Sequence, residues 1–141
     1  MAIIETSINI AATPSRVWQV LLDFPGYPEW NPFIRSISGS VSAGRKLKIR
    51  VEPPGRRAMS FRPVILVADP ERELRWRGKV LVPGIFDGEH YFRLEPHGSG
   101  TRLVHGEGFT GILLPLMRSA LRATEEGFRA MNEALKKRAE A

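Results

Sequence analysis

Residues 112–141, ILLPLMRSALRATEEGFRAMNEALKKRAEA, decide the fold. Apolar side chains recur in this stretch at every third or fourth position, with Arg and Glu between them, which predicts one amphipathic helix of about seven turns. Its apolar positions are Leu113, Leu116, Met117, Ala120, Leu121, Thr124, Phe128, Met131 and Leu135. A stripe of this length has to be buried against a large apolar surface elsewhere in the chain.

The chain before this helix reads mainly as strands, in which apolar and polar side chains alternate. Seven such segments precede the helix, at 3–11, 34–42, 45–53, 58–68, 72–82, 85–96 and 101–111. The turn signals between them include Ser42-Ala43-Gly44, Pro53-Pro54-Gly55, Pro83-Gly84 and His97-Gly98-Ser99-Gly100. Because the helix is the one element long enough to cover such a sheet, we predict an α+β domain with a curved antiparallel sheet around it.

Two short helical segments are expected between the first and second strands. Thr13 is a helix N-cap followed by Pro14, and apolar residues at helical spacing continue to about Asp23. Residues 24–33 then hold three prolines and four aromatic residues, a composition too broken for a long element and too apolar for a free linker. We expect this stretch to form a structured, partly buried lid or turn.

Composition narrows the class of protein. At 141 residues, with 43% hydrophobic and 26% charged residues, the chain fits one folded domain spanning 1–141. It has no Cys, which excludes disulfides and thiolate chemistry, and it has only three His. The N-terminus shows no basic segment followed by an apolar run, and no stretch approaches the ~18 apolar residues of a membrane span. We therefore expect a cytoplasmic protein without a cofactor.

The sequence resembles the START-like, or SRPBCC, superfamily, and within it the polyketide cyclase/dehydrase-like group of small bacterial proteins, over essentially its whole length. The resemblance rests on Ala12-Thr13-Pro14, Val17-Trp18, Tyr27-Pro28-Glu29-Trp30-Asn31-Pro32, Gly100-Thr101-Arg102-Leu103 and Phe109-Thr110-Gly111. It implies a helix-grip fold, in which a seven-stranded antiparallel sheet surrounds the C-terminal helix and a cavity between them takes an apolar ligand. The mouth of that cavity would lie by the turn and the first helices.

Three polar side chains are predicted to point into the interior of this fold. In the last strand, His105 and Glu107 share one parity with apolar neighbours, and the same parity in the preceding strand places His90 and Phe92 inward. The hairpin turn at 97–100 sets His90 opposite Glu107 and Phe92 opposite His105. Continuing the meander through Pro83-Gly84 brings Trp76 beside His90.

The polar cluster has more than one interpretation. Glu107 would fix the tautomer of His90, leaving the other ring nitrogen or His105 to bind a hydroxyl group or to remove a proton α to a carbonyl. Alternatively the pair only satisfies its own hydrogen bonds, as buried polar groups usually do. Two His and one carboxylate also suit a transition metal, but nothing outside these strands supports a metal site and we predict none.

Further candidate ligand contacts lie in the turn and the final helix. By the resemblance, Tyr27 and Trp30 sit at the cavity rim, although they could equally form a hydrophobic plug. The helix stripe either roofs the cavity or makes core, and Gly127 either leaves room beside Phe128 or is an exposed glycine. The predicted ligand-binding set is Tyr27, Trp30, Trp76, His90, Phe92, His105, Glu107, Phe109, Met117, Leu121, Thr124 and Phe128.

The leading hypothesis is a non-catalytic binder or carrier of a small hydrophobic molecule, such as a lipid, polyketide, quinone or other aromatic compound. A cyclase or dehydratase that uses His90, His105 and Glu107 as acid–base groups is the first alternative. The second is docking of a macromolecule on a basic outer sheet face, in keeping with the net charge of +6. That face would comprise Lys46, Lys48, Arg50, Arg75, Arg77 and Lys79.

This basic face has no interleaved aromatic side chains for base stacking, which disfavours nucleic acid as a partner and favours a simple solvated surface. No glycine-rich loop indicates a nucleotide. Monomer and homodimer both remain open.

Overall fold

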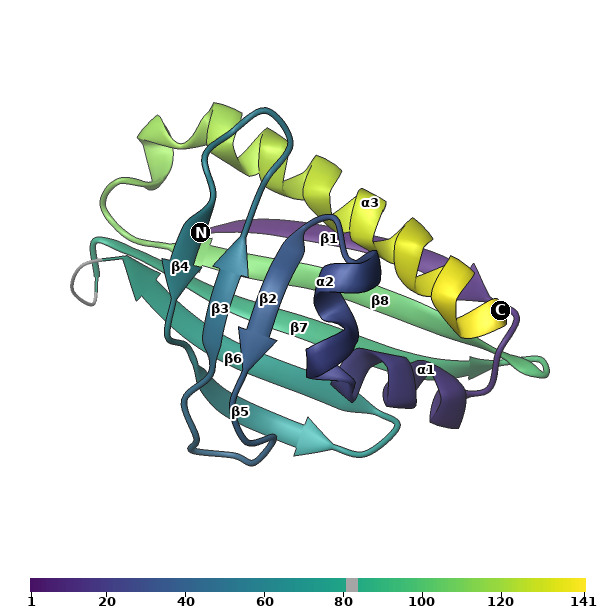
Figure 1. Cartoon of the computed structure of the whole chain (residues 1–141). Coiled ribbons are helices and arrows are strands. Elements are labelled where there is room, and N and C mark those ends of the chain that lie inside the picture. The colour runs from purple at the N-terminus through teal and green to yellow at the C-terminus, as the bar shows by residue number, and fades with distance from the viewer. Residues whose placement is uncertain (81–83) are drawn as a thin grey trace.

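The computed structural model describes residues 1–80 and 84–141 and shows two antiparallel sheets with a long helix, α3 (Arg118–Glu140), lying over them (Figure 1). The larger sheet has the strand order β1 (Ala2–Ile10), β8 (Gly100–Thr110), β7 (Phe86–His97), β6 (Glu73–Val80), β5 (Val64–Asp69). The smaller sheet has the order β2 (Ile34–Ser38), β3 (Lys48–Val51), β4 (Met59–Phe61). This is the predicted α+β architecture, with the sheets curving around the helix.

The prediction of one seven-stranded sheet is wrong in detail. In the described residues the chain has eight strands in two sheets, because the predicted strand 58–68 is divided into β4 and β5 around Pro63. Proline has no N–H to give to a ladder, and here the Pro63 carbonyl accepts from the Leu47 backbone N–H at 2.8 Å. The predicted turn at Pro83-Gly84 and the end of the predicted strand 72–82 fall partly on 81–83, outside the described residues.

The two short helices after β1 are present. In α1 (Pro14–Leu22), the Thr13 hydroxyl oxygen accepts the Arg16 N–H at 3.2 Å, as expected of an N-cap before a first-turn proline. The 3₁₀ turn η1 (Phe24–Gly26) and α2 (Tyr27–Trp30) follow. Buried Asn31 then directs the chain into β2, because its Oδ1 accepts the backbone N–H groups of Phe33 and Ile34, both at 2.9 Å.

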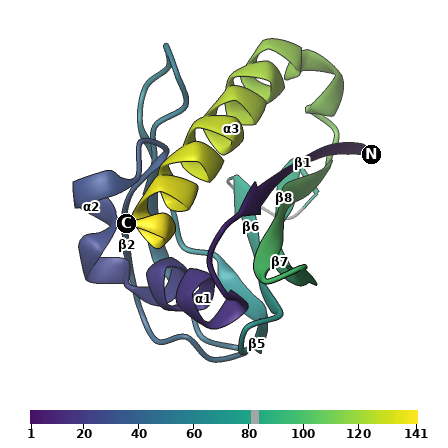
Figure 2. The same cartoon turned by 90° about the vertical axis from the view of Figure 1, so that its right-hand side faces the viewer.

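The two halves of helix α3 differ in burial; the C-terminal end lies beside α1 and α2, and the N-terminal end lies away from them (Figure 2). It begins at Arg118, later than predicted, because a separate 3₁₀ turn, η2 (Leu114–Leu116), holds the preceding proline. The C-terminal half buries Phe128, Met131 and Leu135 in the core. Apolar residues of the N-terminal half, such as Leu121, are only partly buried. The C-terminal half therefore holds the fold together, and the N-terminal half leaves space beneath it.

Gly127 is buried in the middle of α3 and has a clear steric role. A Cβ atom at this position would lie 2.3 Å from Cδ1 of Phe33. The glycine therefore makes room for the Phe33 ring, which packs edge-on against Phe128 at a centroid distance of 5.5 Å. Of the two interpretations of Gly127, the exposed one is wrong. None of the helices in the described part of the chain is long and apolar enough to cross a membrane.

Candidate functional site

A cavity of about 210 Å³ lies between the two sheets, beneath the N-terminal half of α3. Ile49 and Val51 of β3 form one wall, Trp76 and Phe109 of the larger sheet form the opposite wall, and Leu121 contributes to the roof. The lining is mostly apolar, and its polar members are Lys79, His90, Glu107 and Thr124. The Thr124 hydroxyl donates to the Ala120 carbonyl at 2.9 Å. His90 and Glu107 are thus the polar groups that converge on this space.

The structure brings seven of the twelve predicted contact residues to the cavity wall. They are Trp76, His90, Glu107, Phe109, Met117, Leu121 and Thr124. Phe92, His105 and Phe128 lie in the core and do not line the cavity. These positions define a wall of contact candidates, with a buried layer behind it.

Tyr27 and Trp30 are not at the cavity rim. Tyr27 is fully buried, and its hydroxyl donates to the Leu21 carbonyl at 2.6 Å. Its ring contacts Trp30 edge-on at a centroid distance of 5.1 Å. Neither side chain lines the cavity. The prediction that the cavity mouth lies beside the turn and the first helices is therefore wrong.

The predicted pairing of the inward residues is confirmed. In the β7–β8 ladder His90 lies opposite Glu107, and Phe92 lies opposite His105. In the β6–β7 ladder Trp76 lies opposite His90, and the two rings stack at a centroid distance of 4.8 Å. The regular ladder is therefore what presents His90 and Glu107 side by side at the cavity wall.

A continuous set of hydrogen bonds, called here the inner chain, runs from Glu107 to Thr6. Glu107 Oε1 lies 3.1 Å from His90 Nδ1, and His90 Nε2 lies 2.8 Å from His105 Nε2. On the far side, His105 Nδ1 lies 2.8 Å from Oδ1 of Asn132 in α3. The Asn132 amide donates to the Thr6 hydroxyl at 2.8 Å, and that hydroxyl donates to the His105 carbonyl at 2.8 Å.

The direction of donation in the inner chain follows from its far end. Because the Asn132 amide nitrogen donates to Thr6, its oxygen accepts, so His105 carries its proton on Nδ1 and accepts on Nε2. His90 then donates from Nε2 and has a free acceptor at Nδ1. Glu107 must supply the proton at the other end, which it does as a neutral carboxylic acid.

Burial favours the same neutral state. Removal from water raises the pKa of Glu107 to about 8 and lowers the pKa of His90 to about 3. Burial, together with repulsion from His90, also lowers the pKa of His105 well below its ordinary range, although its hydrogen bond to the Asn132 oxygen acts in the opposite direction. At neutral pH the inner chain therefore contains an un-ionised Glu107 beside two neutral imidazoles.

Glu107 is also the member of the inner chain with an unused polar atom at the cavity. Its side chain is 18% exposed, and it lines the cavity. Among the described residues, Oε2 makes no hydrogen bond. It lies over Gly88, where a Cβ atom would approach it to 2.1 Å. With the proton directed from Oε1 to His90, Oε2 is a carbonyl-type acceptor for a bound molecule.

His105 is positioned to support His90 rather than to touch a ligand. It is fully buried between the rings of Phe92, at a centroid distance of 4.4 Å, and Phe128, at 4.2 Å. Both of its ring nitrogens are occupied. Of the three candidate acid–base residues, His90 and Glu107 line the cavity and His105 lies behind them.

Thr6 and Asn132 are the members of the inner chain that sequence reasoning missed. Thr6 shares the inward parity of Ile4 and Ile8, and a polar side chain among inward apolar ones is a visible signal. Asn132 adjoins buried Met131 on the helix stripe. The sequence shows that both polar residues lie beside buried apolar ones, but it does not show which side chain each of them hydrogen-bonds.

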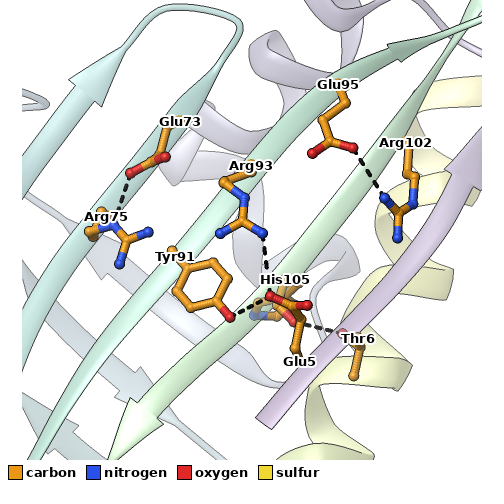
Figure 3. A network of polar contacts seen from close by, with 9 residues as sticks. All are labelled: Glu5, Thr6, Glu73, Arg75, Tyr91, Arg93, Glu95, Arg102 and His105. Carbon is orange, nitrogen blue, oxygen red and sulfur yellow. Dashed lines mark hydrogen bonds and ion pairs between the residues drawn. The ribbon is translucent and has the colours of Figure 1, made fainter. Parts of the chain in front are cut away.

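The outer face of the larger sheet holds a separate network of charged side chains (Figure 3). Arg75 pairs with Glu73 at 2.8 Å and with Glu89 at 2.7 Å. Partial burial alone would lower the pKa of Arg75, but its hydrogen bonds to these two carboxylates raise it above the ordinary value. Nearby, Glu5 accepts from the Tyr91 hydroxyl at 2.7 Å and from Arg93 at 3.3 Å.

The predicted single basic sheet face does not form. Lys48 and Arg50 belong to the smaller sheet, whereas Arg75 and Arg77 belong to the larger one. Since the cavity lies between the sheets, their outward residues face away from each other, and Arg75 is already paired. Within the residues that the structure describes, no group of three His, Asp or Glu is arranged to hold a metal ion.

Comparison with known proteins agrees with this architecture. Over residues 1–140 the sequence matches the family described as polyketide cyclase / dehydrase and lipid transport. The chain is similar to the Zhui aromatase/cyclase from Streptomyces sp. R1128, with a TM-score of 0.76, 19% identity and coverage of 99% of this chain and 93% of that one. A search of the curated proteins finds no match.

Two further solved structures share the fold. A START superfamily protein from Mycobacterium smegmatis is 20% identical, with a TM-score of 0.75 and coverage of 98% and 97% of this chain and that one. Protein MLL2253 from Mesorhizobium loti is 17% identical, with a TM-score of 0.77 and coverage of 96% and 95%. The chain belongs to the polyketide cyclase / dehydrase and lipid transport family.

Proposed function

We propose that this protein binds a small, mostly apolar molecule that carries one O–H or N–H group, and that this group donates to Oε2 of Glu107. The observation that supports the proposal most strongly is an apolar cavity whose wall contains an un-ionised acid with one free acceptor atom. A ligand with a single donor satisfies that atom, while its apolar remainder fills the rest of the space.

The walls favour a flat ring system. Trp76 lines the cavity and stacks on His90, and Phe86 and Phe109 line it as a parallel pair at a centroid distance of 5.5 Å. Aromatic faces pack well against planar apolar ligands. Phenolic and other hydroxylated ring compounds therefore fit the site better than flexible chains without a donor.

A matched pair of probes tests this selectivity. We expect 2-naphthol to bind about tenfold more tightly than 2-methoxynaphthalene, because the ether has no proton for Glu107 and leaves the acceptor unsatisfied. Isothermal titration calorimetry and Trp fluorescence measure both affinities. Equal binding of the two probes, or binding of neither, would refute the proposed mode of recognition.

Two pairs of variants locate the binding. Ala120 lines the cavity, so Ala120→Phe should fill it and abolish binding of 2-naphthol, whereas Ala130→Phe on the exposed face of α3 should not. Glu107→Gln keeps a donor for His90 and an acceptor for the ligand, and should retain the preference for 2-naphthol. Glu107→Leu should lose that preference. Unchanged binding by Ala120→Phe would place the ligand elsewhere.

Acid–base catalysis of the cyclase or dehydratase kind is a second candidate function. The specific observation that favours it is the pKa of about 8 for Glu107, which places a transferable proton near neutral pH at the cavity wall. Native mass spectrometry of the protein from its own host, followed by organic extraction, identifies the bound compound. If the protein is an enzyme, Glu107→Gln retains binding of that compound but stops its conversion. A compound recovered unchanged after incubation with wild-type protein supports binding alone.

A further inference from the structure

An exposed apolar and basic surface lies at one end of the molecule, formed by the β3–β4 loop, the start of β4, the segment before α3 and the first turns of α3. Its projecting apolar side chains are Met59, Ile112 and Leu116, which are 48%, 74% and 80% exposed. Around them lie the exposed side chains Arg56, Arg57, Arg118 and Arg122. We call these seven residues the mouth patch. Both views place the loop and the start of α3 at the same end of the fold (Figures 1 and 2).

The mouth patch surrounds the place where the cavity reaches the surface. A shallow hollow beside the β3–β4 loop is lined by Pro53, Met59, Ala120 and Thr124, and all four also line the cavity. The loop touches the first turn of α3, where Arg56 Nη1 lies 3.4 Å from the Ser119 hydroxyl oxygen. The cavity therefore opens between this loop and α3.

The segment before α3 presents different residues to the cavity and to the outside. Leu113 and Met117 line the cavity, whereas Ile112 and Leu116 project outward. The segment is anchored to the β6–β7 connection, since the backbone N–H groups of residues 112 and 113 donate to the carbonyls of Gly84 and Ile85, both at 3.1 Å. Its outward apolar side chains are thus held in place by a fixed backbone.

The charge around the mouth has a single sign. Stretches 53–63 and 110–124 contain five Arg and no Asp or Glu. The flanking carboxylates already have basic neighbours: Glu52 lies 4.0 Å from Arg35, and Glu125 pairs with Arg129 at 3.1 Å. In the described part of the chain, no arginine of the mouth patch has a carboxylate within 4.0 Å. Projecting aliphatic side chains ringed by unpaired cations are complementary to an anionic lipid surface.

We propose that the mouth patch binds the surface of an anionic lipid bilayer, with Ile112 and Leu116 inserted among the acyl chains, so that the cavity opens toward the membrane. An acidic protein partner would also pair with the arginines. Its surface, however, offers nothing comparable to the acyl chains of a bilayer for the exposed side chains of Ile112 and Leu116. The proposal goes beyond ligand binding, because contact with a bilayer does not depend on which molecule the cavity holds.

Vesicle co-sedimentation tests the proposal with purified full-length protein and no added ligand. We expect binding to phosphatidylcholine vesicles that contain 30% phosphatidylserine and at least tenfold weaker binding to pure phosphatidylcholine. Arg118→Gln with Arg122→Gln should weaken binding to the mixed vesicles about 30-fold. Ile112→Ser with Leu116→Ser should reduce binding about tenfold or more.

Matched controls use similar residues outside the patch. Ile3→Ser removes another exposed aliphatic side chain, and Lys48→Gln with Arg50→Gln removes two exposed cations, and both should bind vesicles like wild type. The proposal would be overturned if wild-type protein did not bind the vesicles that contain phosphatidylserine. It would also be overturned if the control variants lost as much binding as the patch variants. Because none of the substituted patch residues lines the cavity, the variants should still bind 2-naphthol, so failure of docking and failure of ligand binding give different results.

Discussion

The inner and outer faces of strands β7 and β8 hold two polar networks made from alternate residues of the same sequence. On the inner face, His90, His105 and Glu107 lie in the inner chain, where burial favours their neutral forms. On the outer face, Arg93 pairs with Glu5, and Arg102 pairs with Glu95 at 3.2 Å (Figure 3). The outer pairs stay in contact with water and are ionic.

On each face of these strands, a glycine makes room for a polar side chain of the neighbouring strand. A Cβ atom at Gly88 would lie 2.1 Å from the Glu107 carboxyl oxygen, on the inner face. A Cβ atom at Gly106 would lie 2.5 Å from the Tyr91 hydroxyl oxygen, on the outer face. Each glycine leaves space for a polar group on the neighbouring strand. Both groups are un-ionised at neutral pH, because burial raises the pKa of Glu107 to about 8 and is the largest cause that raises the pKa of Tyr91 to about 12.

Breaking the inner chain at its helix end should have the largest effect on stability. Asn132→Leu leaves the Nδ1–H group of His105 buried without an acceptor. It also removes the donor to the Thr6 hydroxyl, which keeps only its own hydrogen bond to the His105 carbonyl. We expect the free energy of unfolding to fall by about 2–4 kcal/mol, measured by urea denaturation. A loss below about 1 kcal/mol would show that these hydrogen bonds do not stabilise the fold.

Alanine at the two glycines should separate stability from binding. Gly106→Ala meets the backbone carbonyl oxygen of Ile4 at 2.7 Å as well as Tyr91, so we expect a loss of about 2 kcal/mol with 2-naphthol binding retained. Gly88→Ala would place its Cβ against the side-chain carboxyl group of Glu107 rather than against backbone, so we expect a loss of about 1 kcal/mol or less together with weaker 2-naphthol binding. The reverse pattern in denaturation and calorimetry would contradict this assignment of the two faces.

The neutral inner chain predicts a particular pH dependence of stability. The pKa of Glu107 rises from 4.5 to about 8 on folding, so the folded state keeps a proton that the unfolded state loses, and stability falls as pH rises through that range. The pKa of His90 drops from 6.5 to about 3, so stability falls as pH decreases below 6.5, and His105 acts in the same direction. The contribution of these groups is greatest near pH 6.5.

Glu107→Gln provides the control for this pH profile. Gln keeps the hydrogen bond to His90 without titrating, so the loss of stability between pH 6.5 and 8 should be smaller in the variant than in wild type. The loss on acidification should remain, because the two His are unchanged. Thermal denaturation at a series of pH values measures the loss of stability on both sides of pH 6.5. An equal loss between pH 6.5 and 8 in the two proteins would argue against a protonated Glu107.

Removal of an outer ion pair should change the free energy of unfolding least. Arg102→Gln removes an ion pair whose side chains are 48% and 46% exposed, so we expect a change below about 1 kcal/mol that decreases further in 1 M salt. Urea denaturation at low and high salt measures it. A loss as large as that of Asn132→Leu would remove the energetic distinction between the two faces.

The register of the site was predictable because it depends on local rules. The period of two in β7 and β8, together with one hairpin turn at 97–100, is sufficient to set His90 opposite Glu107. Trp76 follows from the next hairpin in the same way. These pairings need no knowledge of how distant parts of the chain pack.

The remaining features depend on long-range packing and were not predictable from local patterns. Asn132 joins the inner chain only because of how α3 is rotated and placed over the sheet, which the helix stripe alone does not determine. The mouth lies between Met59 and Ala120, residues far apart in sequence, so the expected position beside Trp30 was wrong. The division of strand 58–68 had a local signal in Pro63, but the pairing of its two parts with different sheets did not.

The protonation state of Glu107 tests the central claim most directly. Infrared difference spectroscopy of wild type against Glu107→Gln, recorded across a pH titration, isolates the carboxyl C=O band of this side chain. The account predicts a protonated carboxyl group at pH 7 that ionises with a midpoint near 8. A carboxylate band already present at pH 6, with a midpoint near the ordinary value of 4.5, would contradict the neutral inner chain and the ligand recognition proposed from it.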